Sequence, residues 1–346
     1  MKDPAKIGNP RKIGIYIGVP GLGDLLFIIP LFRAFKKKFP DAETVFIGRL
    51  LHSYVKPVFD NCPYIDRLID FHLYEKKSAA AYASFVRRLR RERFDLIVDT
   101  QRKFLPSLLL SLSGAKFMIS YSSGGIFSDF PVNTENRTGR HTSDVSLDLA
   151  RAACIENPET HLEISTGEEN RRYAEEFYSG AGVSPSDILV GFIPGAGVHT
   201  RQWNGGKFAA LADRLANELH CRLIAFGSLK DKPAIDDVIS RSGAPFIIED
   251  FGRKSILDSA ALMARCNAIV GVDSGPLHVA DAAGAPCVGI YGPTLPDRFG
   301  LLGKRTIEVC RHEDCAPCSD MNCSHRKCLE DITVDEVFDA VKKILE

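Results

Sequence analysis

The stretch "GVDSGPLHVADAAGAP", residues 271–286, places polar side chains where an apolar strand gives way to a helix. Asp273 and Ser274 end the strand, Gly275 permits a tight turn, and His278 falls in the first helical turn. The N–H groups and positive dipole end of a helix N-terminus form an anion site, and glycine lets a phosphate approach the backbone. A purely local role is equally compatible, in which Ser274 caps the helix and His278 packs against its neighbours.

A second acidic side chain, Asp24, lies in "GVPGLGDLLFIIP", residues 18–30. The glycine spacing departs from G-x-G-x-x-G, and an aspartate would repel a bound pyrophosphate, so the stretch argues against a nicotinamide dehydrogenase. A carboxylate at a strand-end turn can take a proton from a hydroxyl nucleophile. Asp24 is also a good helix N-cap, and both interpretations remain open.

A third stretch, "IPGAGVHTRQWNGGKFAAL" (193–211), has a glycine-rich loop followed by Arg201 and Trp203. A guanidinium beside such a loop can grip a diphosphate. The alternative is a surface arginine next to a partly buried tryptophan.

Five of the ten cysteines crowd into residues 310–328 with the spacing C-x4-C-x2-C-x4-C-x4-C. They are Cys310, Cys315, Cys318, Cys323 and Cys328, and His312 and His325 lie between them. Thiolates and imidazoles are ligands for a structural Zn²⁺ or iron ion. Reduced or disulfide-paired structural cysteines are the alternative.

These residues must be positioned by alternating strands and helices. A chain of 346 residues has the length of two domains. Apolar strands such as "KIGIYIGV", "DLIVDT", "ILVGFIP" and "AIVGVDS" alternate with amphipathic helices, which predicts two Rossmann-like, doubly wound parallel sheets with ligand sites at the carboxyl ends of their strands. We expect one long helix from Asp24 to Phe39, a long loop from Ser122 to Arg140 and a final helix in "TVDEVFDAVKKILE".

Charge and hydropathy argue against general nucleic-acid binding and against a membrane-spanning helix. The 44 basic and 44 acidic residues balance, so no general attraction to nucleic acid is expected. No apolar run approaches the roughly 18 residues of a spanning helix, and no export signal is recognisable. The basic helix "FVRRLRRERF" and the lysines at 36–38 either lie against anionic lipid or a phosphorylated acceptor, or form solvated faces.

Together these stretches resemble the ADP-heptose:lipopolysaccharide heptosyltransferases, glycosyltransferase family 9. "GLGDLLFIIP" resembles the family's G-D-x5-P stretch, "PGAGVHTRQW" its loop before a tryptophan, and "VDSGPLHVADAAGAPCVGIYGPT" its most specific motif. The likeness also covers "FDLIVDTQRKFLPSLLLSLSG", and so nearly the whole chain. Arg201 stands where the family usually has lysine, and Asn204 replaces a common proline.

The resemblance implies the GT-B fold and an inverting transfer of heptose from ADP-heptose to a hydroxyl of the lipopolysaccharide inner core, with no required cofactor. Asp24 and Arg201 are then catalytic, with Gly23 and Gln101 on the acceptor side. The donor-binding set is Gly195, Ala196, Thr200, Asp231, Asp273, Ser274, Gly275 and His278. Asp231 is also a candidate helix cap.

The expected domains are an acceptor-binding domain over residues 1–165, a nucleotide-sugar domain over 166–330, and a C-terminal helix, 331–346, that crosses back to the first domain. The expected location is cytoplasmic, peripheral at the inner face of the inner membrane. The alternatives are a transferase with another nucleotide sugar or a protein acceptor, and a non-catalytic nucleotide-sugar or metal-binding module.

Overall fold

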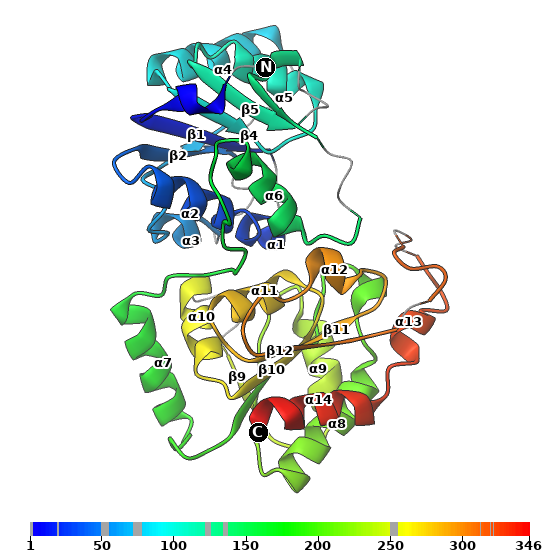
Figure 1. Ribbon diagram of the computed structural model, residues 1–346. Coiled ribbons are helices and arrows are strands. Elements are labelled where there is room, and N and C mark those ends of the chain that lie inside the picture. The colour runs from blue at the N-terminus through cyan, green and yellow to red at the C-terminus, as the bar shows by residue number, and fades with distance from the viewer. Residues whose placement is uncertain are drawn as a thin grey trace. The chain divides into compact units, whose positions relative to one another are not determined.

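The computed structural model describes residues 3–18, 21–49, 55–71, 78–121, 126–133, 138–249, 255–311, 313–318, 320 and 322–346. Its contacts divide the chain into two compact units, Met1–Thr160 and His161–Glu346 (Figure 1). Each unit is built around one parallel sheet.

The first unit contains a six-stranded sheet in the order β3-β2-β1-β4-β5-β6. Every neighbouring pair in it is parallel. The strands are β1 (Lys12–Ile17), β2 (Glu43–Gly48), β3 (Arg67–Asp70), β4 (Leu96–Asp99), β5 (Phe117–Tyr121) and β6 (Phe130–Val132). The central strands β1, β2 and β4 are almost wholly buried, as expected for a parallel sheet covered on both faces.

Helices of the first unit are η1 (Pro4–Ile7), α1 (Leu22–Leu26), α2 (Ile29–Lys38), α3 (Lys56–Asp60), α4 (Ala79–Glu92), α5 (Phe104–Ser111) and α6 (Thr142–Arg151). The single helix expected from Asp24 to Phe39 is wrong, because α1 ends at Leu26 and α2 begins at Ile29. Pro30 explains the break, since it has no N–H to donate to the carbonyl of Leu26.

The loop expected from Ser122 to Arg140 also needs correction. It contains β6, whose Phe130 lies opposite Ile119 of β5, and residues 122–125 and 134–137 lie outside the described part. Asp129 N–H donates to Met118 O at 2.9 Å and leads into the pairing. A three-residue strand with a central proline is too short for its alternation to be recognised.

The second unit has the sheet order β12-β11-β10-β7-β8-β9. Its strands are β7 (Leu189–Ile193), β8 (Arg222–Ala225), β9 (Phe246–Ile248), β10 (Ala268–Val272), β11 (Cys287–Tyr291) and β12 (Thr306–Cys310). Its helices are α7 (Glu168–Gly180), η4 (His199–Arg201), α8 (Gly205–Glu218), α9 (Lys232–Arg241), α10 (Ile256–Ala264), α11 (Gly275–Ala282), α12 (Pro296–Phe299), α13 (Lys327–Glu330) and α14 (Val334–Leu345).

The last helix, α14, packs on the second sheet. It contacts α8 and strands β10, β11 and β12, and buries Val337, Val341 and Ile344 in the core of this unit. The expectation that it crosses back to the first domain, and the three-part division of the chain, stay predictions.

Both sheets have the same winding. In each, the first strand lies beside the fourth, so the chain reverses direction across the sheet between β1 and β4 and again between β7 and β10. Ligands of doubly wound sheets bind outside the carboxyl ends of the strands at this switch point. The predicted doubly wound parallel sheets are therefore confirmed, and the switch points are the places to examine for function.

Candidate active site

The switch point of the second unit brings together residues from two of the predicted stretches. Arg201 ends η4 in the loop after β7, and Asp273 directly follows β10, which pairs with β7. One guanidinium nitrogen, Nη1 of Arg201, lies 3.3 Å from Oδ2 of Asp273. Asp273 is buried, and Arg201 is partly exposed. The buried carboxylate therefore holds the guanidinium in place while part of the guanidinium remains accessible to solvent.

Asp273 has two further partners. His278 Nε2 lies 3.5 Å from its Oδ1, and the Thr294 hydroxyl donates to its Oδ2 at 2.5 Å. Burial raises the pKa of Asp273, but hydrogen bonds from His278 and Thr294 and the charge of Arg201 outweigh it and hold this pKa below its ordinary value. Thr294 comes from the "YGPT" stretch and was not singled out from the sequence. The carboxylate therefore organises three side chains around the turn before α11.

Ser274 stands at the N-cap position of α11 and makes no capping hydrogen bond, so the prediction that it caps the helix is wrong. The residue is 9% exposed, and its Oγ has no hydrogen-bond partner in the part of the chain that the structure describes. A buried hydroxyl without a partner costs about 1–3 kcal/mol. It is the kind of group that a ligand at this helix N-terminus would satisfy.

Glycines set the shape of the turns around α11. Gly275 is its first residue and Pro276 its second, where a missing N–H costs nothing. Gly284 follows the helix end with φ +81°, in the left-handed region that favours glycine. The strand-to-helix turn expected at Gly275 is confirmed.

The loop after β7 carries Gly195, Ala196 and Thr200, and Ala196 and Thr200 are buried. A Cβ on Gly195 would lie 2.4 Å from Oδ1 of Asp231, so only glycine fits against this aspartate. Asp231 Oδ2 accepts hydrogen bonds from the N–H and hydroxyl of Ser228, at 2.8 and 2.7 Å. It closes the turn before α9 and makes no side-chain bond to the helix itself, so its predicted role as a cap of α9 is wrong.

Trp203 is buried and structural. Its Nε1 donates to Ile332 O at 3.2 Å, and its ring packs edge-on against Phe208 at 4.9 Å between centroids. The sequence predicted only a partly buried ring, because the partner Ile332 lies far along the chain.

In the first unit, Asp24 is the third residue of α1, and Gly23 precedes it. The predicted N-cap role of Asp24 is wrong, because Gly21 is the N-cap of α1. The exposed Asp24 carboxylate instead accepts the Gly21 N–H through Oδ2 at 3.0 Å from the third helical position. The other oxygen, Oδ1, makes no hydrogen bond to the described residues. The bond from Gly21 therefore leaves one oxygen of Asp24 able to accept a proton.

Gln101 packs against the loop after β1. A Cβ on Gly18 would lie 2.8 Å from the Gln101 amide carbon, so the loops after β1 and β4 meet at the switch point of this unit. The Gln101 N–H donates to Asp99 Oδ1 at 2.8 Å, and the Ser107 hydroxyl donates to Oδ2 at 2.6 Å. Asp99 is wholly buried, and burial raises its pKa to about 7 against the opposing effect of those two bonds.

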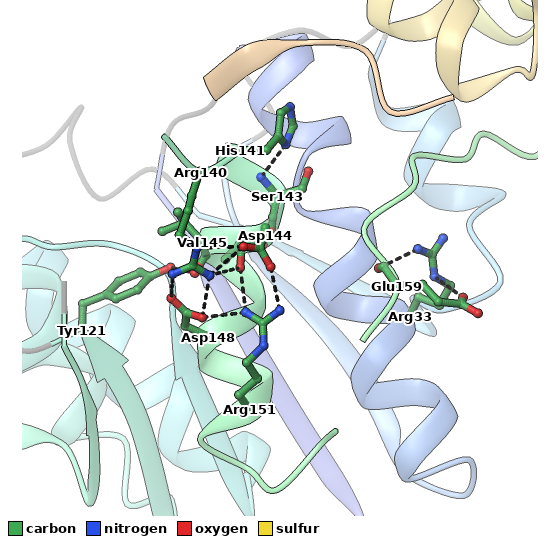
Figure 2. A network of polar contacts seen from close by, with 11 residues as sticks. Arg33, Tyr121, Arg140, His141, Ser143, Asp144, Val145, Asp148, Arg151 and Glu159 are labelled. Atoms are coloured by element: carbon green, nitrogen blue, oxygen red, sulfur yellow. Dashed lines mark hydrogen bonds and ion pairs between the residues drawn. The ribbon is translucent and has the colours of Figure 1, made fainter. Parts of the chain in front are cut away.

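Helix α6 and the residue before it contact Phe27, which directly follows α1. The Ser143 hydroxyl donates to Phe27 O at 3.0 Å, and the His141 ring lies edge-on to Phe27 at 5.0 Å. Behind this contact, Arg140 and Arg151 each pair with both Asp144 and Asp148, at 2.6–2.9 Å (Figure 2). This network was not predicted from the sequence, although charged residues at i, i+4 and i+8 indicate a charged helix face.

All ten cysteines are free thiols, and Cys310 lies in β12. Four others line a cavity of about 10 Å³, roughly one water-sized sphere, next to Thr200 and Pro293. Burial and the neighbouring thiols raise the pKa of Cys328. The lining includes Cys315, Cys318, Cys323, Cys328 and His325. Among the described residues, which leave out His312, no three metal-binding side chains are placed to hold an ion.

Two doubly wound parallel sheets of six strands each match the architecture of GT-B glycosyltransferases. The chain belongs to glycosyltransferase family 9, the heptosyltransferases, whose family model matches residues 82–329. The enzyme class and the fold expected from the sequence are confirmed.

Individual relatives cover nearly the whole chain. Lipopolysaccharide heptosyltransferase 2 of Salmonella typhimurium is 24% identical over 96% of this chain and 98% of its own length. A glycosyltransferase family 9 structure from Veillonella parvula has a TM-score of 0.85 with 24% identity, covering 97% of both chains. ADP-heptose LPS heptosyltransferase II from E. coli has a TM-score of 0.75 with 20% identity, covering 96% of this chain and 98% of the other.

Proposed function

We propose that this chain transfers a heptose from ADP-heptose to a hydroxyl of the lipopolysaccharide inner core, with inversion at the anomeric carbon. The observation that carries the proposal is the buried, unsatisfied Ser274 hydroxyl at the N-terminus of α11, beside the Arg201–Asp273 pair. This arrangement suits a diphosphate, and the names of the relatives supply the sugar and the acceptor.

Donor binding is assigned to the second unit. The diphosphate would accept hydrogen bonds from the first N–H groups of α11 and from the Ser274 hydroxyl, and Arg201 would supply the positive charge. His278 and Asp273 would orient these donors, while Gly195, Ala196, Thr200, Gly275 and Asp231 would shape the walls. Fixed donors of this kind stabilise the negative charge that develops on the departing diphosphate, which is why no metal step is needed in the proposal.

The acceptor is assigned to the first unit, with Gly23 and Gln101 near it. Asp24 would take the proton of the attacking hydroxyl through Oδ1. The hydroxyl oxygen then forms a bond to the anomeric carbon as the bond from that carbon to the diphosphate oxygen breaks, and ADP leaves with the electron pair. Attack opposite the leaving group inverts the configuration.

The direct test is to incubate the purified protein with ADP-heptose and heptose-deficient core lipopolysaccharide in EDTA, and to follow ADP release. The proposal expects ADP only when both substrates are present. Turnover of UDP- or GDP-sugars instead, or heptosylation of a protein acceptor, would retain the enzyme class and overturn the substrate assignment. ADP-heptose binding without any turnover would favour the non-catalytic module.

We also propose that the enzyme works at the cytoplasmic face of the inner membrane, where its acceptor is anchored. Support comes from exposed arginines of α4, among them Arg87 and Arg91, which suit anionic lipid. No helix within the described residues has the length and apolarity to cross a membrane. Flotation with vesicles containing anionic lipid, with binding lost in high salt, is the expected result; equal binding to neutral vesicles would contradict it.

A structural Zn²⁺ or iron ion in the thiol-lined cavity is a further proposal. Four thiols and one imidazole form a donor set that either metal accepts. Because the described side chains are not placed as a ligand set, no step of the reaction is assigned to the metal.

A further inference from the structure

Arg326 lies beneath the loop that carries Arg201. Its Nη1 donates to Gln202 O at 3.2 Å, and its Nη2 pairs with Glu330 Oε1 at 2.9 Å. The side chain is only 18% exposed. The Arg326 guanidinium thus joins the loop that carries Arg201 to α13. Its ion pair with Glu330 fixes the orientation of the planar guanidinium.

The segment around Arg326 holds the loop at other points too. Ile332 O accepts hydrogen bonds from Trp203 Nε1 at 3.2 Å and from Lys207 Nζ at 3.0 Å. On the other side of the cavity, Cys318 N–H donates to Pro293 O at 2.9 Å, next to Thr294. Cys318, Arg326 and Ile332 therefore contact the chain neighbours of Arg201 and of Thr294. Arg201 and Thr294 are the two residues that meet Oδ2 of Asp273.

The backbone at Arg326 is unusual. Its φ of +39° and ψ of +36° lie in the left-handed region, which a non-glycine residue adopts at a cost in energy. Such a conformation persists where surrounding contacts determine it, and it commonly marks a functional position. The guanidinium of this residue contacts Gln202 O and Glu330.

We propose that Arg326 is a positioning residue for Arg201, holding the loop in the conformation that binds the diphosphate of the donor. The inference rests on the proposed function. Gln202 connects Arg326 to the rest of the loop. Its N–H donates to His199 O at 3.0 Å, and its side-chain amide donates to Ala196 O at 3.2 Å. Fixing the Gln202 carbonyl therefore fixes the turn from Ala196 to Arg201, and a preorganised cation loses less conformational freedom on binding.

Trp203 gives this inference its own spectroscopic readout. It is the single tryptophan of the chain and follows Gln202 directly. Its emission, and the access of acrylamide to its ring, report the state of the loop with or without activity.

The experiment compares the full-length protein with Arg326→Met, Arg326→Lys and a control, Arg241→Met. Arg241 is an exposed residue of α9, ion-paired with Asp237. We expect Arg326→Met to increase acrylamide quenching of Trp203. The Kd for ADP and the KM for ADP-heptose should rise by up to about tenfold, because binding must then supply the cost of ordering the loop. Arg326→Lys should fall between, and the control should match the wild type, with the KM for the acceptor unchanged throughout.

Unchanged quenching and unchanged ADP affinity in Arg326→Met would overturn the inference. A lower Tm with both readouts unchanged would also overturn it, because Arg326 would then be structural only. If Arg326→Met does not fold, Arg326→Lys decides by the same two readouts. A wild type that neither binds ADP nor turns over ADP-heptose would defeat the proposed function, while the quenching comparison would still decide whether Arg326 holds the loop.

Discussion

At the scale of single residues, the Ser274 hydroxyl is expected to weaken the stability of the free protein and to strengthen ADP binding. Its hydroxyl is buried without a partner in the described structure, so Ser274→Ala removes an unsatisfied group and should leave the free energy of unfolding unchanged or raise it by up to about 1 kcal/mol. The same change should raise the Kd for ADP about tenfold, since the ligand loses a hydrogen bond. Denaturant unfolding and calorimetric titration measure the two effects.

Ser143→Ala is the matched control for Ser274→Ala. The Ser143 hydroxyl is also buried but donates to Phe27 O, so its removal should cost about 1 kcal/mol of stability. ADP affinity should not change, because Ser143 lies in the other unit. A loss of stability in Ser274→Ala, with ADP affinity retained, would show that the hydroxyl has a structural partner and no ligand role.

Asp24 allows its two roles to be separated. Asp24→Asn keeps an oxygen to accept the Gly21 N–H, but an amide cannot take a proton from the acceptor. We expect kcat to fall at least about 100-fold with an almost unchanged Tm. Asp24→Ala should lose the same activity and about 1 kcal/mol of stability as well. Near-normal turnover by Asp24→Asn would mean that the residue only stabilises the start of α1.

At the scale of elements, the thiol segment from Cys315 to Cys328 carries the metal prediction. The metal proposal expects about one equivalent of zinc or iron, by elemental analysis, in protein purified under reducing conditions without added metal. It requires the four thiols to move into a tetrahedral set, which the described side chains do not form. Cys323→Ser with Cys328→Ser should abolish that content. Cys62→Ser, a change at a buried thiol of the first unit, should not. An empty wild-type preparation would leave these residues as reduced structural thiols.

Helices and strands are predictable from this sequence where the apolar pattern is long, and they are not predictable where a proline interrupts the pattern or the strand is very short. The strands and helices on both sides of Asp273 were placed correctly, because a fully apolar strand and a glycine-proline turn are strong local signals. The break at Pro30 and the strand β6 were missed, since a proline inside an apolar run and a three-residue strand give little periodicity. Strand β12 was missed although Thr306, Ile307 and Val309 are β-branched residues that favour a strand, and it pairs with β11 at the end of the second sheet.

At the scale of the whole molecule, the sequence predicted the doubly wound sheets and the identity of the polar residues at their edges. It could not predict which side chains meet. The contact of Arg201 with Asp273 depends on β7 pairing with β10, and that of Arg326 with Gln202 joins residues more than a hundred positions apart. The burial of Asp99 likewise depends on β4 occupying the middle of its sheet.

That burial predicts how global stability depends on pH. The pKa of Asp99 is about 7 in the folded protein and near its ordinary value of 3.8 in the unfolded chain. Between these values the folded state binds more protons than the unfolded state, so this group's contribution to the free energy of unfolding falls as pH rises from about 4 to about 7. The total loss is a few kcal/mol, about 1.4 kcal/mol for each pKa unit.

Asp99→Asn should remove this dependence, because the amide resembles the protonated acid and can still accept the Gln101 N–H. The difference in unfolding free energy between Asp99→Asn and the wild type should therefore shift in favour of the variant as pH rises from 5 to 7, and then level off. Asp95→Asn is the control at the other end of β4. Hydrogen bonds from Lys116, Arg11 and Lys12 outweigh burial and lower the pKa of Asp95, so its carboxylate is ionised in both states over this range and the difference should stay constant. A constant difference for Asp99→Asn as well would show that Asp99 is ionised in the folded protein. The Gln101 N–H would then donate to a buried carboxylate and not to a neutral acid.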